Sequence, residues 1–522
     1  MFSQVQQSDS GTTIDNVDII TIYKPDVAES VKIEIEPKLV EPKHDPFNYN
    51  YSFPDVSYQP KAVYSPIDPI YLKPEKDRDY YDNYFQIGGG NYGTSFIDAQ
   101  VFNTQDKYYT YGLRVKHHAS SFSNNPNQGL FSENRITAFG KREKGGTLSG
   151  EIDYKRNVVH YYGYVDSTEL TLDDINQIYN DINAHAKWLK NANFGQSSLK
   201  AGFDIFDRLS GNEFTVNLEN QNEFKIGSGS TFFLDLGVNY NSIKRDVQYN
   251  RFYVDAFPHY KFKQRKYIID IGLKTTFFND SNTSVLYFAP HLDAHTYLVP
   301  DKLKAYLGVT GGLQKNSMRD MTNQNLFLGN DAEFRNPFEQ FHIYAGMNGH
   351  FKRFVEYGIR LSQKVIHDQF FFVNDTNRLR NLTTVYDSVG MFSFSGELKL
   401  DINRNLDLGF AATVYSYNLN NQKNAWHAPS YDAKAFVTLR LAEKLYISAA
   451  YFAIGPRTAV NLRGEQTSLN AINDINLGAE YRYKKNISAF LNLQNVLNQK
   501  YQIWNRHNAQ GFNVLAGVTF SI

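Results

Sequence analysis

The feature that most constrains this chain is strict alternation of apolar and polar residues, repeated from about residue 84 to the C-terminus. In the segment 474–484 the odd positions are Ile, Leu, Ala and Tyr, whereas the even positions are Asp, Asn, Gly, Glu, Arg and Lys. The segments 355–365 and 392–402 follow the same rule. Because successive side chains of a strand point to opposite faces, each segment predicts a strand with one apolar wall and one charged wall.

Three observations favour a membrane-spanning β-barrel over a soluble β-sandwich, which also alternates. Segments of ten or more residues match a tilted membrane crossing, and their polar faces carry several charges, as a wet lumen permits. Short connections are expected at 263–266, 299–301, 352–354, 401–405, 441–445 and 484–486, and long ones near 316–339, 368–386, 418–431, 454–473 and 495–510. Alternating short periplasmic turns and long external loops are typical of outer-membrane barrels.

The strand number follows from a parity argument. The pattern yields 21 segments, but a barrel with both ends in the periplasm needs an even number. The sidedness counted from the two termini conflicts between residues 207 and 250, so we expect one misassigned strand there. The prediction is an all-β fold, with a transmembrane antiparallel barrel of 20 or 22 strands spanning residues 85–522.

Composition excludes several classes of function. Lys and Arg number 54, as do Asp and Glu, so the chain has no basic excess for binding nucleic acid. It has no cysteine, which rules out disulfides and thiolate chemistry. The mean hydropathy is −0.49, and no run of about 18 apolar residues predicts a transmembrane helix. No Ser/His/Asp set, paired-carboxylate motif or glycine-rich phosphate loop stands out, so we expect no enzyme and no cofactor.

Residues 1–84 form a different kind of sequence. They hold nine of the 16 prolines, at positions 25, 37, 42, 46, 54, 60, 66, 69 and 74, which excludes central strands and helices. We expect an extended segment that occupies the lumen or its periplasmic mouth, or docks a periplasmic partner there. The first residues lack the basic and apolar regions of a signal peptide, so we expect the start to lie inside a longer precursor that carries one.

One stretch predicts a helix. In Thr171–Leu189 the apolar residues Ile175, Ile178, Ile182 and Ala186 recur at helical spacing, behind a candidate cap. We expect a short amphipathic helix in a loop, folded over or into the barrel mouth.

The candidate functional residues are charged side chains on the polar faces of the predicted strands. The lumen-facing candidates are Glu356, Arg360, Lys364, Glu397, Lys399, Asp474, Glu480 and Arg482. His291, Asp293 and His295 also share a polar face, but residues two apart on a strand are separated by about 6.6–7 Å, so the three cannot share one metal ion. We therefore expect polar lumen lining and no metal site.

Two C-terminal motifs carry a family resemblance. The sequence of Asn495–Tyr501, N-V-L-N-Q-K-Y, resembles the N-L-F-D/N-K-K-Y stretch before the last strand of TonB-dependent receptors. Gly517, Phe520 and Ile522 look like the terminal signal read by the barrel-assembly machinery, although the last residue is Ile where that signal has Phe. The resemblance implies an outer-membrane barrel for solute transport or reception, in the style of Bacteroidota proteins.

The chain departs from that family at its N-terminus. Residues 1–84 are too short and too poor in glycine for the plug domain, and Val17–Thr21 is only faintly similar to a TonB box. Two hypotheses follow: a transport or receptor barrel, and a plug-less structural subunit that scaffolds an outer-membrane protein complex. The expected partners are outer-membrane lipid, the barrel-assembly machinery, and either TonB or an outer-membrane or periplasmic lipoprotein.

Overall fold

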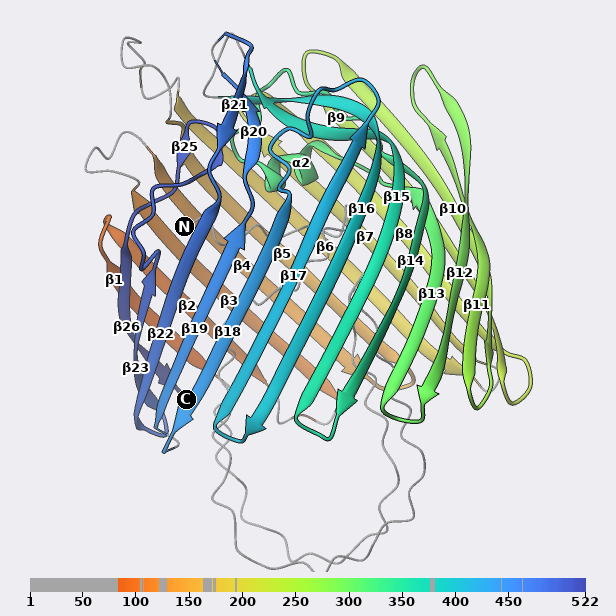
Figure 1. The fold of residues 1–522 in the computed structure, drawn as a ribbon, viewed down its shortest axis with the longest axis horizontal. Coiled ribbons are helices and arrows are strands. Elements are labelled where there is room, and N and C mark those ends of the chain that lie inside the picture. Colours follow the sequence, from red (N-terminus) through yellow and green to blue (C-terminus); the bar gives the residue numbers. More distant parts are fainter. Residues whose placement is uncertain are drawn as a thin grey trace, which may run out of the picture.

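The computed structural model describes residues 83–103, 106, 108–121, 129–162, 171, 175–192, 195–375, 381–442, 444–461 and 463–522, so the Pro-rich segment up to residue 82 lies outside the described residues. Twenty-two strands form one closed antiparallel sheet (Figure 1). They are β1 (Tyr84–Gly90), β2 (Thr94–Asn103), β3 (Tyr109–Ser121), β4 (Leu130–Glu143), β5 (Thr147–His160), β6 (Asn176–Ala192), β7 (Gly195–Arg208), β8 (Gly211–Lys225), β9 (Ser230–Lys244), β10 (Gln248–Lys263), β11 (Tyr267–Asn279), β12 (Ser284–Val299), β13 (Leu303–Leu313), β14 (Phe338–Phe351), β15 (Val355–Asn374), β16 (Leu382–Asn403), β17 (Leu406–Leu419), β18 (Tyr431–Leu441), β19 (Leu445–Ile454), β22 (Ile472–Lys484), β23 (Ile487–Gln494) and β26 (Asn513–Ser521). The predicted barrel is confirmed, with the larger of the two strand numbers.

Each strand pairs with the next one in the wall, and the barrel closes where β1 meets β26. Gly88 pairs with Gly517 at this seam, and the ring of Phe490 on β23 covers both. A Cβ atom on Gly88 would lie 2.9 Å from the Phe490 ring, and one on Gly517 would lie 2.5 Å from it. The seam therefore requires glycine at both positions. Phe520 and Ile522 lie on the outer face and are exposed.

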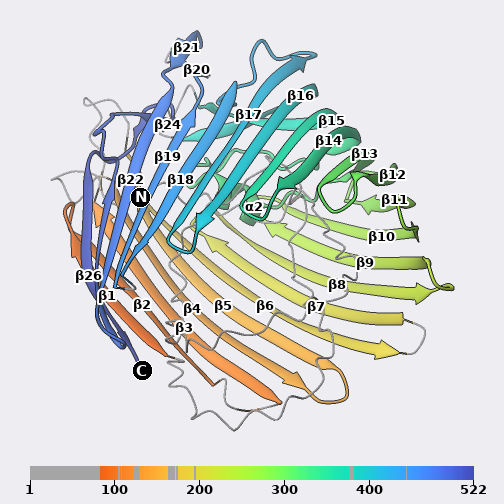
Figure 2. The same cartoon turned by 60° about the horizontal axis from the view of Figure 1, so that its bottom comes forward.

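The barrel has two unlike ends (Figures 1 and 2). At the turn end, which also holds Asn83 and Ile522, the connections are 104–108, 144–146, 193–194, 226–229, 264–266, 300–302, 352–354, 404–405, 442–444 and 485–486. At the loop end they are 91–93, 122–129, 161–175, 209–210, 245–247, 280–283, 314–337, 375–381, 420–430, 455–471 and 495–512. Two small hairpins stand at the loop end: β20 (Arg457–Val460) with β21 (Gln466–Leu469), and β24 (Gln502–Trp504) with β25 (His507–Asn508).

These connections explain the miscounted strand. The loop-end connections after β7, β9 and β11 are as short as the turns at the other end. Loop length therefore carries no information about sidedness between residues 207 and 250, where the sidedness counted from the two termini conflicts.

The two faces of the wall differ as the alternation predicts. On β22, Leu477, Tyr481 and Tyr483 are 36%, 48% and 64% exposed on the outer face, whereas Asp474 and Glu480 are buried on the inner face. Exposed apolar side chains recur around the outside of the barrel, which is the surface that hydrocarbon would cover. None of the helices in the described part of the chain is long and apolar enough to cross a membrane, a finding that does not bear on crossing by strands.

The predicted helix over Thr171–Leu189 is wrong. From Asn176 onward the chain is strand β6, paired with β5 on one side and β7 on the other. The spacing of Ile178, Ile182 and Ala186 is four residues, which fits one face of a strand as well as one face of a helix. The helix that the structure describes is α2 (Met318–Gln324), in the long connection between β13 and β14.

Candidate functional site

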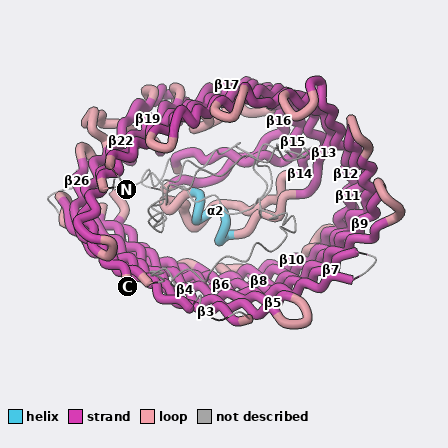
Figure 3. The backbone as a smooth tube through the Cα atoms, turned by 90° about the horizontal axis from the view of Figure 1, so that it is seen from below, coloured by secondary structure: helices cyan, strands magenta, loops and turns pink. Residues whose placement is uncertain are grey.

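The most distinctive element is the connection 314–337, hereafter the cap loop, which folds into the barrel at its loop end. Seen along the barrel in Figure 3, α2 lies inside the ring of strands. Met318, Met321, Phe327 and Leu328 of this loop are fully or almost fully buried. They belong to the hydrophobic core of the molecule, together with side chains from the loop-end parts of the wall.

The cap loop is mostly irregular backbone, so its carbonyl groups need partners from elsewhere. Tyr179 donates to the carbonyl oxygen of Leu326 at 2.7 Å, and Arg208 donates to that of Leu328 at 2.9 Å. Three further side chains donate hydrogen bonds to backbone carbonyl oxygens of the cap loop. They are Arg245 to Ala332, Arg251 to Asn316 and Phe334, and Tyr386 to Glu333. The wall thus satisfies the loop along its length, which holds it in one position.

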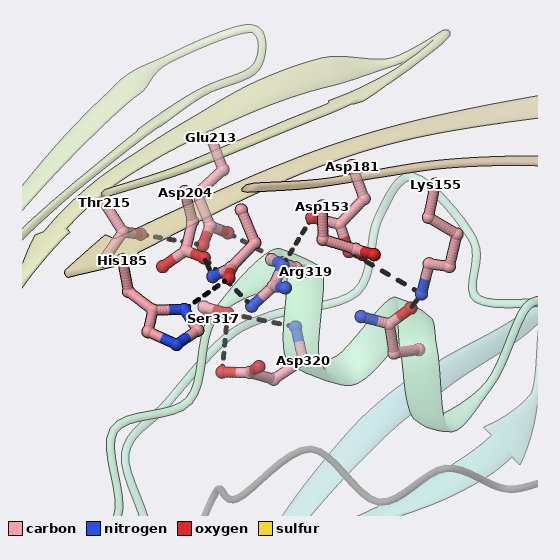
Figure 4. A network of polar contacts seen from close by, with 12 residues as sticks. Asp153, Lys155, Asp181, His185, Asp204, Glu213, Thr215, Ser317, Arg319 and Asp320 are labelled. Carbon is pink, nitrogen blue, oxygen red and sulfur yellow. Dashed lines mark hydrogen bonds and ion pairs between the residues drawn. The ribbon is translucent and has the colours of Figure 1, made fainter. Parts of the chain in front are cut away.

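An ion-pair network fixes α2 to the opposite wall (Figure 4). Arg319 Nε lies 2.7 Å from Asp181 Oδ1 on β6, and its Nη1 lies 3.4 Å from Asp204 Oδ1 on β7. The backbone N–H of Arg319 donates to Glu213 Oε2 on β8 at 3.1 Å. Lys155 on β5 adds a second cation, 3.6 Å from Asp181. Asp181 and Asp204 are buried, so Arg319 compensates charges that would otherwise be costly in the interior.

The start of α2 is fixed by its own cap. Ser317 has an extended backbone, and its hydroxyl accepts a hydrogen bond from the N–H of Asp320 at 3.0 Å. The same hydroxyl donates to the Asp320 carboxylate at 2.8 Å. These contacts satisfy one of the free N–H groups at the helix start.

Other loops brace the cap loop from outside. The rings of Phe327 and His507 are 3.9 Å apart, and Phe372 contacts Trp504 at 5.1 Å. His427 bonds on both sides: its Nε2 accepts from the N–H of Asn505 at 3.1 Å, so its Nδ1 donates to the Phe372 carbonyl at 2.8 Å. Burial lowers the pKa of His427 to about 4. Trp504 and His427 are both packed against neighbouring loops within this end.

A cavity of about 930 Å³ lies between the cap loop and the wall from β4 to β14. Its lining is strongly polar, with eight carboxylates and five Lys or Arg side chains. Toward the turn end, Glu151, Lys200 and Glu219 line it without a hydrogen bond or ion pair in the described part of the chain. The cavity can therefore offer charged groups of both signs to a polar occupant.

The eight lumen-facing candidates are distributed unequally around this cavity. Arg360 lies 4.4 Å from the ring centre of Tyr344, and Lys364 lies 3.6 Å from Glu339, and both of these partners line the cavity. The other six are on parts of the wall away from it. Glu356, Glu397 and Lys399 lie near the turn end of β15 and β16, and Asp474, Glu480 and Arg482 lie on β22, where Tyr501 donates to Asp474 and Arg482 stacks on Tyr446.

The side chains of His291 and Asp293 contact residues on neighbouring strands. Asp270 lies 2.8 Å from His259 Nδ1 and 3.9 Å from His291 Nε2, and Asp293 accepts from Tyr344 at 2.6 Å. Among the described residues no group of three or more His, Cys, Asp or Glu side chains is arranged to hold a metal ion.

Sequence reasoning missed the residues that build the cap. Asp181 lies in the stretch that was predicted as a helix, so it was not recognised as a lumen-facing residue of a strand. Arg319 lies in a loop, where no periodicity indicates its role. A usable signal was present in β6, because Asp181, Asn183, His185 and Lys187 alternate strictly with apolar or small residues.

Comparisons with known proteins place the fold. No protein-family model matches the chain, and no curated protein matches it in sequence. Solved structures do match. The FrpB iron transporter from Neisseria meningitidis superimposes with a TM-score of 0.68 at 8% identity, covering 84% of this chain and 82% of that one. A mutant of the ferric enterobactin receptor PfeA from Pseudomonas aeruginosa gives 0.64 at 9% identity, with 84% and 80% covered.

The siderophore receptor PirA from Acinetobacter baumannii gives a TM-score of 0.64 at 10% identity, with 84% of this chain and 80% of that one covered. At such low identity the likeness concerns the fold. The chain therefore has the barrel fold found in bacterial transporters and receptors for iron and siderophores.

Proposed function

We propose that this chain is a bacterial outer-membrane β-barrel of the TonB-dependent receptor type, which takes part in transport or reception of a solute. The fold likeness and the apolar outer surface support the membrane and the type of barrel. The polar cavity supports a role for the interior. Fold alone does not assign a function, so the proposal rests on the cavity.

The observation that carries the proposal is the set of unpaired charges in that cavity. Glu151, Lys200 and Glu219 come from β5, β7 and β8 and lie on the turn-end halves of these strands. Charges that hold a fold together are paired, as around Arg319, whereas charges left free in a cavity are available to a ligand. The solute class that fits is polar and carries charge or many hydrogen-bonding groups.

The test measures a path through the barrel. In planar bilayers in potassium chloride, we expect little current through the intact protein, because the cap loop occupies part of the lumen at the loop end. Arg319→Ala should raise the current by loosening the cap loop. Adding Glu219→Gln to this variant should then shift its selectivity toward anions. If neither substitution changes the current, the cavity does not lie on a path for ions through the barrel.

Orientation is part of the proposal, with the loop end outside the cell and the turn end in the periplasm. Asn421→Cys and Gln466→Cys place a thiol at exposed loop-end positions, and Lys485→Cys places one in an exposed turn. The native chain has no cysteine, so the background is clean. An impermeant thiol reagent on whole cells should label the first two and spare the third, and the opposite pattern would invert the topology.

A second candidate function is a structural barrel that scaffolds an outer-membrane complex. The closely held cap loop favours it, because a loop fixed inside the lumen by packing and ion pairs is poorly suited to letting a large solute pass. Purification from native membranes in mild detergent separates the two candidates. A stoichiometric protein partner, such as a lipoprotein, supports the scaffold, whereas an isolated barrel supports transport or reception.

The Pro-rich segment of residues 14–84 completes the proposal. It joins the barrel at the turn end, next to Ile522, so we propose that it acts in the lumen or at its periplasmic mouth, or docks TonB or another periplasmic partner there. Deleting residues 14–80 and recording current distinguishes these roles. A large new conductance supports a plug-like role, and a lost partner with unchanged conductance supports docking.

A further inference from the structure

The two ends of the barrel differ sharply in charge. Across the ten turn-end connections the sequence has ten Lys or Arg residues and three Asp or Glu residues. Across the eleven loop-end connections it has eleven of each sign. The chain as a whole is neutral, so this excess of positive charge is specific to one rim.

The basic residues are spread around that rim. Lys144, Lys302 and Lys444 each stand in a different turn, and the turn 352–354 holds the pair Lys352 and Arg353. The turns 193–194 and 226–229 contain no basic residue, and the nearest basic residues are Lys190 on β6 and Lys225 on β8. Basic residues in most of the turns create a positive potential along the rim.

Two lysines at this rim, Lys352 and Lys484, lie beside aromatic rings that are exposed on the outer face. Lys352 Nζ is 5.6 Å from the ring centre of Phe351 and 5.7 Å from that of Phe354, and Lys484 Nζ is 5.6 Å from that of Tyr483. Phe351 and Tyr483 are 61% and 64% exposed. Aromatic rings with flanking lysines on an outward membrane surface are typical of the headgroup level, where the ring meets the acyl chains and the ammonium meets phosphate.

We propose that the turn-end rim, defined here as the described residues of the turn-end connections with the flanking residues Lys190, Lys225 and Lys484, is a docking surface for anionic phospholipid headgroups. The partner chemistry is a phosphodiester lipid with net negative charge, such as phosphatidylglycerol. The proposal rests on the membrane-spanning part of the proposed function and is independent of any solute. It gives the rim the role of holding the barrel at a fixed depth through charge as well as through its apolar belt.

The competing occupant is the chain's own N-terminus. Residues 1–82 carry 15 acidic and eight basic side chains and join the barrel at the same end. The lipid is favoured because Phe351 and Tyr483, the rings that Lys352 and Lys484 approach, are exposed on the outer surface of the barrel. The experiment treats the acidic segment as one of its outcomes.

The test uses the full chain in bilayers of phosphatidylcholine and phosphatidylglycerol, with spin-labelled lipids reporting association with the barrel. We expect the phosphatidylglycerol probe to associate about two- to threefold more strongly than the phosphatidylcholine probe at low salt, and the preference to fall as salt rises. Lys352→Gln with Arg353→Gln should reduce the preference measurably. Lys423→Gln with Arg463→Gln removes two exposed charges from the loop end and should leave it unchanged.

Three results would overturn the proposal. One is equal association of both lipids with the native barrel, and another is an equal loss of preference in the loop-end control. The third is a preference that arises only after residues 14–80 are deleted, which would assign the rim to the acidic segment. Heat-modifiable mobility in electrophoresis confirms that each variant is a folded barrel. A folded barrel without lipid preference would therefore contradict the lipid-docking proposal and would not affect the proposed transport or reception of a solute.

Discussion

Two groups of charged side chains in the barrel interior, one around the cap loop and one in the turn-end half on β7 and β8, use charge in opposite ways. Around the cap loop, Asp181 and Asp204 are buried and are paired with Arg319, which also comes from a buried element. In the turn-end half, Lys200 and Glu219 face each other on paired strands without an ion pair in the described residues. Paired charges fix a structure and unpaired ones recognise a partner, so the comparison assigns closure to one half and recognition to the other.

The largest expected effect sharpens this comparison directly. Arg319→Ala removes the cation beside Asp204 and leaves only Lys155 beside Asp181, and breaking a buried ion pair costs about 3–5 kcal/mol. We expect the cap loop to lose protection in hydrogen exchange. The matched variant Lys200→Ala removes a cation from the other half and should leave that protection unchanged. Equal loss in both variants would mean that the two halves do not differ in this way.

A second prediction tests the wall that both halves share. Leu477→Arg places a charge on the outer face and should cost about 2–4 kcal/mol at mid-membrane, which would impair assembly. Asn476→Arg places the same charge one residue away on the inner face. It loses the hydrogen bond from Asn495, worth about 1 kcal/mol, and should still assemble. Heat-modifiable mobility of the two variants measures the difference, and equal tolerance would contradict the assignment of the faces.

Much of the wall was predictable because its physical signal is local. A strand that faces lipid on one side and a wet interior on the other must alternate, as residues 355–361 of β15 and 474–484 of β22 do. The parity of both termini limited the strand number to even values. The side of the membrane on which each connection lies could not be predicted where loop-end connections are as short as turns, as after β7 and β9.

The cap loop could not be predicted for the opposite reason. Its position depends on contacts between residues more than 100 positions apart in sequence, such as Arg319 with Asp181 and Arg208 with Leu328. No period or local motif encodes such pairs. The helix predicted over Thr171–Leu189 shows the same limit, since residues four apart share a face in a helix and in a strand, and only pairing with β5 and β7 decides between them.

The third prediction concerns pH and applies to the loop end alone. Burial lowers the pKa of His427 to about 4, below its ordinary value of 6.5. The unfolded chain therefore binds the proton more readily, so the stabilisation is fully present above pH 6.5 and is lost as pH falls toward 4. The difference corresponds to at most about 3 kcal/mol. Protonation would place a hydrogen on Nε2 against the N–H of Asn505 and separate the bracing loops.

Fluorescence can follow this transition, because Trp504 lies 5.4 Å from His427 and the chain has only three tryptophans. With Trp188→Phe and Trp426→Phe as background, the emission of Trp504 should change between pH 6.5 and 4. His427→Gln should abolish the change. A transition that persists in the His427→Gln variant would have to come from another group.

The smallest expected effect is at the start of α2. Ser317→Ala removes the hydroxyl that accepts from the N–H of Asp320, and loss of such a cap costs about 1 kcal/mol. The cap loop has other attachments through Arg319 and the wall tyrosines, so the loop should stay in place while the amides of Met318–Gln324 exchange roughly fivefold faster. Ser228→Ala, in an exposed turn at the other end, should change no exchange rate in the cap loop. If Ser317→Ala instead releases the whole loop, then the helix cap, and not the ion pairs of Arg319, is what closes the loop end.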